Sequence, residues 1–344
     1  MAVDESPWAV PAGSGNLLAP ESTEVGSAGH AGRIPRLFAA VCFAAIVLLS
    51  VILVLQPYNM TVHSGQHQYD AMSGMPDLVP FLLASLISVV LLFTPRTREF
   101  ALGFGLGFSA LWFSAVYAAL SWPKGNADLT TLSQWCVVGS KLLALPAAVC
   151  ILIAALRGRA GAPAGTAPFG LARWRTGLFL AGIVAFGSWG AAGFVDTIKA
   201  VPGANSVAQG LSARPVECCT FNGLSGAGKI DIVSAIIMGL VLVLLATGVR
   251  SAAVSSGIFA GMSLAVVGVV AINVTMLLFP IEFDLGLQNP YLVTHPVQAS
   301  DVTTYSSLTG FWLGLGSFIL LALLAAIRLL MYRSRQDPRP STQE

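Results

Sequence analysis

The chain has 344 residues, of which 55% are hydrophobic and 10% are charged, and its formal net charge is +2. With a mean hydropathy of +0.77, this composition excludes a soluble multidomain protein of the same length. The small net charge gives no reason to expect a nucleic-acid partner, and the five cysteines form no CxxC or other metal-binding spacing. We therefore expect a membrane protein that carries no cofactor.

Long apolar segments recur along the chain. A bilayer core about 30 Å thick needs about 20 apolar residues per helix. Eight segments approach or meet this length, the second and sixth being the shortest: 37–55, 78–94, 100–121, 135–156, 175–195, 232–249, 253–279 and 308–331. They predict an all-α fold, a polytopic membrane bundle of eight transmembrane helices.

The two ends of the chain are polar. Residues 1–36 are rich in Pro, Gly, Ser and Ala and contain no apolar core, so we expect a disordered tail and no cleaved signal peptide. Residues 333–344 form a second polar tail.

The loop charges predict the orientation. Thirteen of the eighteen basic residues fall on the side of the two tails, and Lys141 lies inside the fourth segment. The other side holds only Lys124, Lys199, Arg214 and Lys229. Because Lys and Arg are retained inside, both tails are expected in the cytoplasm, and the Arg- and Ala-rich composition indicates a bacterial cytoplasmic membrane. The outer loops carry nine acids, so their net charge is 4 − 9 = −5, which would attract cations.

The chain resembles itself after a shift of 154 residues (257 − 103 = 154). Nine of 34 aligned positions are identical, among them Asp77 with Asp231 and Arg96 with Arg250. The sequence DLTTLSQW at 128–135 likewise matches DVTTYSSL at 301–308. Chance similarity among apolar helices is the alternative.

We favour a tandem 4+4 duplication, because charged and glycine positions recur along with the apolar ones. It comprises a first four-helix repeat at 37–156, a cytoplasmic linker at 157–174, and a second repeat at 175–332 with longer outer loops. Four helices is an even number, so both copies would enter the membrane in the same direction.

Polar residues inside membrane helices are functional candidates by default. Lys141 and Asn273 both lie in the outer halves of their segments, and acids at the segment mouths would complete a polar cavity that opens outward: Asp77, Asp231, Asp128 and Asp301. Two other interpretations remain open. Lys141 could snorkel to the interface, and the repeated Asp-x-Thr-Thr sequence suits helix N-caps.

The outer segments also contain metal-binding and redox-active residue types. Five thioether and imidazole side chains occur within sixteen positions of the first outer loop: Met60, His63, His67, Met72 and Met75. Such ligands suit copper, and His63 and His67 would share a face if the stretch were helical; an ordinary flexible loop is the alternative. Cys136 could pair with Cys218 or Cys219 in an oxidising outer compartment, or all three could stay reduced.

Glycines spaced as GxxxG occur at equivalent places in the third and seventh segments: Gly103 with Gly107, and Gly257 with Gly261. This spacing lets two helix backbones approach closely. The two segments are therefore expected to pack against each other at a pseudo-twofold axis or to mediate a homodimer, with ordinary helix packing as the alternative.

No catalytic motif is present. The sequence GLSGAGKI at 223–230 lacks the final Ser or Thr of a phosphate-binding loop and follows no predicted strand. We therefore expect an accessory or scaffold protein whose acidic outer loops bind a membrane or extracytoplasmic protein, and no enzyme. The alternative is a permease or channel for a small solute or lipid, with the polar cavity near Lys141 and Asn273.

Overall fold

The computed structural model describes residues 33–55, 58–62, 65–69, 78–114, 116, 131–157, 170–196, 198–201, 220–221, 228–249, 251–278 and 304–336. These residues are almost entirely helical, which confirms the predicted all-α class. Their eight α-helices are α2 (Arg33–Leu55), α4 (Leu78–Phe93), α5 (Arg98–Ser114), α7 (Thr131–Arg157), α8 (Gly170–Ala192), α10 (Gly228–Gly248), α11 (Ala252–Leu278) and α14 (Thr309–Gln336).

Several helices are long and apolar enough to cross a membrane. Among the described residues, three stretches qualify alone, namely Arg33–Leu55, Trp135–Ala155 and Thr309–Met331. A fourth span results if α4 and α5, which are bent by 107° at their junction, are counted as one broken segment. The eight helices coincide in position with the eight predicted segments. Three of them have the length and composition of a span by themselves, and α4 and α5 together make a fourth.

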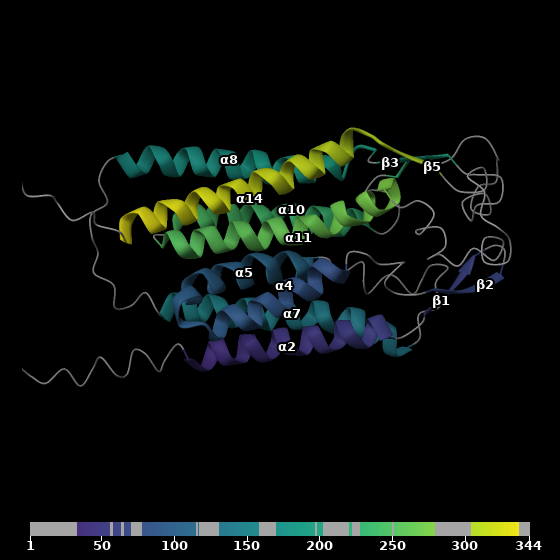
Figure 1. Ribbon diagram of the computed structural model, residues 1–344, viewed down its shortest axis with the longest axis horizontal. Coiled ribbons are helices and arrows are strands. Elements are labelled where there is room, and N and C mark those ends of the chain that lie inside the picture. Colours follow the sequence, from purple (N-terminus) through teal and green to yellow (C-terminus); the bar gives the residue numbers. More distant parts are fainter. Residues whose placement is uncertain are drawn as a thin grey trace, which may run out of the picture.

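The helices lie side by side in two groups (Figure 1). In the first group, α2 and α5 each contact both α4 and α7. In the second group, α8 and α11 each contact both α10 and α14. The groups meet chiefly where α5 packs against α11, with further contacts between α4 and α11 and between α5 and α10. Each contact in the first group therefore has a counterpart in the second.

The junction between α4 and α5 is made by a short 3₁₀ turn, η1 (Pro95–Thr97). Pro95 has no backbone N–H and cannot continue the ladder of α4. The Thr94 N–H instead donates to the Leu91 carbonyl at 3.2 Å, and its hydroxyl donates to the Val90 carbonyl at 3.0 Å. These bonds satisfy carbonyls that the end of α4 would otherwise leave without partners.

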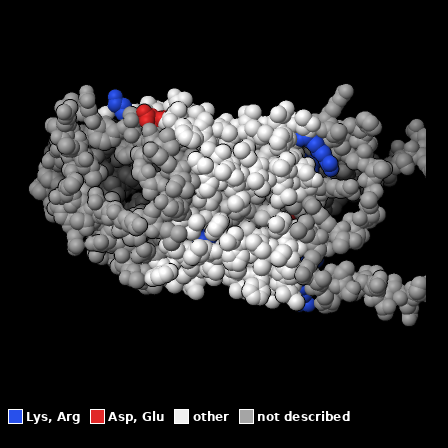
Figure 2. Space-filling view, turned by 180° about the vertical axis from the view of Figure 1, so that it is seen from behind, with Lys and Arg blue, Asp and Glu red and all other residues white. Residues whose placement is uncertain are grey.

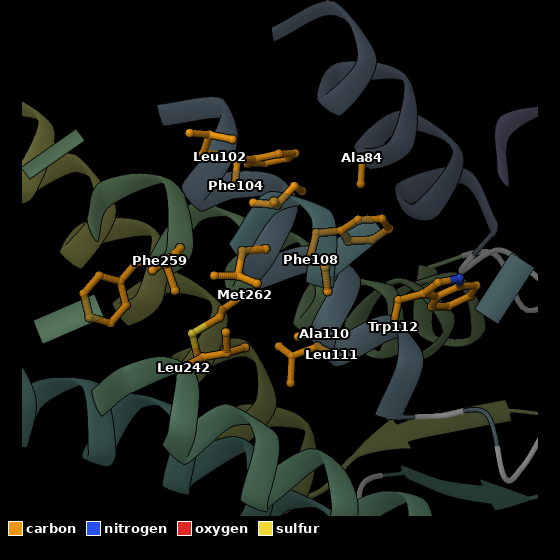
Figure 3. Packing of buried hydrophobic residues seen from close by; sticks show 14 of the residues in the cluster. Ala84, Leu102, Phe104, Phe108, Ala110, Leu111, Trp112, Leu242, Phe259 and Met262 are labelled. Atoms are coloured by element: carbon orange, nitrogen blue, oxygen red, sulfur yellow. The ribbon is translucent and has the colours of Figure 1, made fainter. Parts of the chain in front are cut away.

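The core is apolar and contains small hydroxyl residues. Phe108, Phe259 and Met262 are fully buried and belong to one continuous cluster (Figure 3). Ser50 and Ser88, also buried, donate to the carbonyls four residues earlier in their own helices, both at 2.8 Å. Such internal bonds let a hydroxyl lie in an apolar bundle without a partner from another helix.

The surface between the two ends of the bundle is apolar. Figure 2 shows a broad belt almost free of Lys, Arg, Asp and Glu, with charged side chains near both ends. Side chains such as Val41, Val184 and Leu244 are about 60% exposed on this belt. Because a soluble protein rarely exposes a large continuous apolar surface, the belt is best explained by contact with lipid.

The described part of the chain contains five short strands. The four that Figure 1 labels lie at one end of the bundle, on the right in that view; α2 begins and α14 ends at the opposite end. Strands β1 (Tyr58–Val62) and β2 (Gly65–Tyr69) form an antiparallel hairpin. Strands β3 (Ile198–Val201), β4 (Thr220–Phe221) and β5 (Thr304–Ser307) form an antiparallel sheet in the order β4-β3-β5. These strands were not expected from the sequence.

One interpretation from the sequence is wrong in the second half. Thr304, the last residue of the repeated Asp-x-Thr-Thr, was interpreted as part of a helix cap, but it lies in β5 and α14 begins only at Thr309. Pairing with β3 favours the extended form of this β-branched and aromatic stretch. In the first half, α7 begins at Thr131, and Asp128 lies outside the described residues.

Candidate functional site

The contact between α5 and α11 is made by the four glycines of the GxxxG pairs. A Cβ atom on Gly103 would overlap the Val254 carbonyl oxygen, and one on Gly257 would overlap that of Phe100. The second pair behaves in the same way, with Gly107 against Ile258 and Gly261 against Phe104. The two backbones therefore touch without intervening side chains. We call these four positions the glycine seam.

The contacts of the seam are reciprocal. Gly103 meets Val254 and Ile258, whereas Gly257 meets Phe100 and Phe104. The partners differ by the same number as the glycines, since 254 − 100 = 154 and 258 − 104 = 154. The 154-residue shift therefore converts one set of contacts into the other, as a twofold relation between α5 and α11 would require.

Hydrogen bonds connect both ends of α5 to the second helix group. Glu99 is the second residue of α5, and its carboxylate accepts a bond from the Ser251 hydroxyl, just before α11, at 2.5 Å. At the other end, the Ser234 hydroxyl of α10 donates to the Ser114 carbonyl at 2.7 Å. Because backbone lies on backbone between these anchors, α5 and α11 leave no room for a solute between them.

A cation–aromatic contact connects α7 and α5 in the first group. The Lys141 Nζ lies 4.0 Å from the centroid of the Trp112 ring. Trp112 is 6% exposed, and its ring centroid lies 3.6 Å from that of Phe81 on α4. The indole face attracts the ammonium group, while the buried Trp112 Nε1 has no hydrogen-bond partner among the described residues.

Sequence reasoning identified Lys141 but missed Trp112. Contacts within one helix can be read from a three- or four-residue spacing, but Lys141 and Trp112 lie on different helices. The only available signal was that both residues fall in the same half of their predicted segments.

The structure does not describe the other side chains of the predicted polar cavity. Asn273 and Asp231 lie in α11 and α10, whose backbones are described there, but their side chains are not. Asp77, Asp128 and Asp301 lie outside the described residues. The structure therefore places Lys141 beside the Trp112 ring, and the predicted polar cavity stays a prediction, because its other five side chains are not described.

The Met and His residues of the first outer loop fall on and around the β1–β2 hairpin. Met60 and His67 are directly opposite each other in its register, whereas His63, Met72 and Met75 lie outside the described residues. His67 lies in β2, so the helical case considered for this stretch does not hold at His67. The described part of the chain contains no cluster of three or more His, Cys, Asp or Glu side chains.

The cysteines give no bridge in the described part of the chain. Cys136 is a free thiol on α7 and is 1% exposed. Cys218 and Cys219, its predicted partners, lie outside the described residues.

The three-stranded sheet joins the C-terminal end of α8 to the N-terminal end of α14. Strand β3 follows α8 and pairs with β5, which directly precedes α14. The Gly310 N–H at the start of α14 also donates to the Asp196 carbonyl at 3.0 Å. Lys199, Thr304 and Ser306 are exposed on these strands. Strand β3 ends at Val201 and β4 begins at Thr220. The pairing of these two strands therefore fixes both ends of the connection 202–219.

Comparison with known proteins returned no relative: no family model, curated protein or solved structure matches this chain. The seam, the lysine–tryptophan contact and the three-stranded sheet are therefore the features from which a function can be inferred.

Proposed function

We propose that this protein is an integral membrane scaffold that holds its outer segments in a fixed arrangement for a membrane or extracytoplasmic protein partner. The observation that carries the proposal is the glycine seam. A contact between two backbones cannot slide or open without losing its packing, so the two helix groups behave as one rigid body. Rigidity of this kind suits presentation of a surface better than a transport cycle.

The scaffold is proposed to be a tandem 4+4 repeat of eight transmembrane helices. Three observations support this: the identities after a shift of 154 residues (257 − 103), the reciprocal seam contacts, and the matching contacts within the two helix groups. The short helices α4 and α10 would then cross the bilayer inside the bundle, covered in part by their neighbours.

The strands are proposed to face outward and both chain termini the cytoplasm. The described arginines support this orientation, because they cluster where α2, α5 and α8 begin and α14 ends: Arg33, Arg36, Arg96, Arg98, Arg175 and Arg328. This end would be retained inside by the positive-inside rule. The outer loops, with a net charge of 4 − 9 = −5, would attract a partner with a basic surface.

The partner hypothesis can be tested by replacing residues 202–219 with a six-residue Gly/Ser linker. Because Lys199 pairs with Thr220, the linker can join β3 to β4 without disturbing the sheet. Cells would be treated with a membrane-impermeant amine crosslinker, and adducts of the full-length chain would be identified. We expect a specific protein adduct that disappears in the linker variant.

The matched control replaces residues 158–169, which connect α7 and α8 at the other end of the bundle, with a similar linker. This variant should keep the adduct, and thermal unfolding in detergent should show that both variants are folded. The scaffold hypothesis fails if the wild-type chain gives no specific adduct, or if both variants keep it.

The alternative function is a permease, and the observation in its favour is Lys141 inside the candidate span Trp135–Ala155. Stopped-flow light scattering of vesicles containing the purified chain would separate the two functions, with glycerol and potassium chloride as probes. A scaffold should leave the permeability equal to that of protein-free vesicles. A permease should raise it, and Lys141→Ala should remove the increase.

A further inference from the structure

A groove of about 240 Å³ lies between the first turns of α8 and the last turns of α14. Its lining residues recur every three or four positions, as at Leu178 and Ala181 on α8 and at Leu324 and Arg328 on α14. This spacing puts each set on one face of its helix. The groove is therefore the space between two helix faces that diverge toward the end of the bundle.

The floor of the groove is apolar and open. Leu324 is 5% exposed and belongs to the core cluster, so the groove reaches down to the packed interior. Gly177 contributes no side chain, and a Cβ atom at this position would have no neighbouring atom within 4 Å. A flexible hydrocarbon chain fits a surface of this kind better than a polar ligand does.

The rim of the groove is basic. Arg175 and Arg328 both line it, one from each helix. The Arg328 Nε donates to the buried Ser255 hydroxyl of α11 at 3.1 Å, which orients the guanidinium group. Two guanidinium groups with several donors each match the oxygen atoms of a phosphate.

The groove also lies at the right depth for a lipid headgroup. The candidate span Thr309–Met331 ends at Met331, which lines the groove. Arg328 is one turn earlier in α14. Trp174 lines the same groove and is 64% exposed, as is common for tryptophan at the boundary between hydrocarbon and headgroups.

We propose that this groove binds an anionic phospholipid. An acyl chain lies along the apolar floor past Gly177, and the phosphate group lies between Arg175 and Arg328. A zwitterionic lipid of the same chain length would bind more weakly, because its own cation opposes the two guanidinium groups. The proposal rests on the membrane location of the helices and does not depend on the scaffold function.

Native mass spectrometry of the full-length protein in detergent can test this, with phosphatidylglycerol or phosphatidylcholine added at equal concentration. We expect tighter binding of phosphatidylglycerol. Arg175→Gln and Arg328→Gln should each lower the affinity for phosphatidylglycerol about fivefold, the contribution of one basic residue near an anionic lipid surface. Both variants should leave phosphatidylcholine binding unchanged. Arg96→Gln, an exposed arginine outside the groove, is the charge control and should have no effect.

A second pair of variants tests the floor independently of charge. Gly177→Leu should fill the groove and lower the occupancy of both lipids. Gly187→Leu is its matched control, since it lies on the same helix, also has no atom within 4 Å of a Cβ, and does not line the groove.

Equal binding of the two lipids, or equal losses in Arg175→Gln and Arg96→Gln, would overturn the proposal. The proposal would also be overturned if the wild-type protein were a dimer and Gly177→Leu a monomer, because a second copy of the chain would then occupy the groove. Unchanged lipid binding in Gly177→Leu would overturn the placement of the acyl chain.

Discussion

The two helix groups pack alike in their helices and differ at the end of the bundle that carries the strands. Within the bundle, α2, α4, α5 and α7 contact one another as α8, α10, α11 and α14 do. At that end, the first group carries the β1–β2 hairpin, whereas the second carries a three-stranded sheet drawn from three separate segments. Helix packing allows little variation, whereas the segments that connect helices allow much more.

The repeated Asp-x-Thr-Thr-x-Ser sequence shows how the surroundings decide the local structure. Its first copy leads into α7, which begins at Thr131, and its second copy leads into β5. Strand β3 is available to pair in the second group, and in the first group the described strands pair only with each other. The same sequence thus forms a strand only where a partner strand is available to it.

The largest expected effect tests the equivalence of the two groups at the seam. Gly103→Ala and Gly257→Ala would each force the backbones of α5 and α11 apart, which should lower the free energy of unfolding by about 2–3 kcal/mol. The two losses should be similar, because the contacts are reciprocal. Thermal unfolding in detergent would measure them.

Gly187→Ala is the control for this test, because it lies on an open face of α8. It should be neutral or stabilise by up to ~1 kcal/mol through helix propensity. A large loss at Gly103 with none at Gly257 would contradict the twofold relation.

A smaller effect is expected at a feature of the first group, the Lys141–Trp112 contact. Lys141→Met keeps the length of the side chain and removes the charge, so it should cost about 1–2 kcal/mol. Tryptophan fluorescence should also change as the ammonium leaves the ring. Lys141→Arg should retain most of the stability, and an unchanged emission spectrum in Lys141→Met would contradict the contact.

The smallest effect is expected at Ser85 on α4, whose counterpart after the shift of 154 is Gly239 (85 + 154 = 239). The Ser85 hydroxyl is buried and has no partner in the described structure. Ser85→Ala should therefore be neutral or stabilise by up to ~1 kcal/mol. Ser88→Ala, which removes a bond to the Ala84 carbonyl, is the matched control and should be the less stable variant.

The positions of the helices were predictable because apolar segments of membrane length leave no other choice for the backbone. The close contact at the seam glycines was predictable because two glycines four residues apart leave a helix face without side chains, on which another backbone can pack. The strands were not predictable, because β3, β4 and β5 are two to four residues long and come from segments far apart in the chain.

The candidate sites were predicted less well than the helices. Lys141 was identified from its charge, but its contact with Trp112 depends on how α7 packs on α5. The groove at Arg175 and Arg328 depends on the pairing of α8 with α14. In the sequence, both arginines count only among the basic residues that predict the orientation in the membrane. In each case the missing information was the contact between two helices, which hydropathy does not contain.

The seam also sets an order for biogenesis. Gly103 and its partner Gly257 are 257 − 103 = 154 residues apart, so α5 leaves the ribosome long before α11 exists. Until then the glycine face of α5 has only lipid or a chaperone to cover it. The first half of the protein therefore completes its assembly only after the second half has been inserted, and a chain truncated before α11 should be recognised and degraded as incomplete.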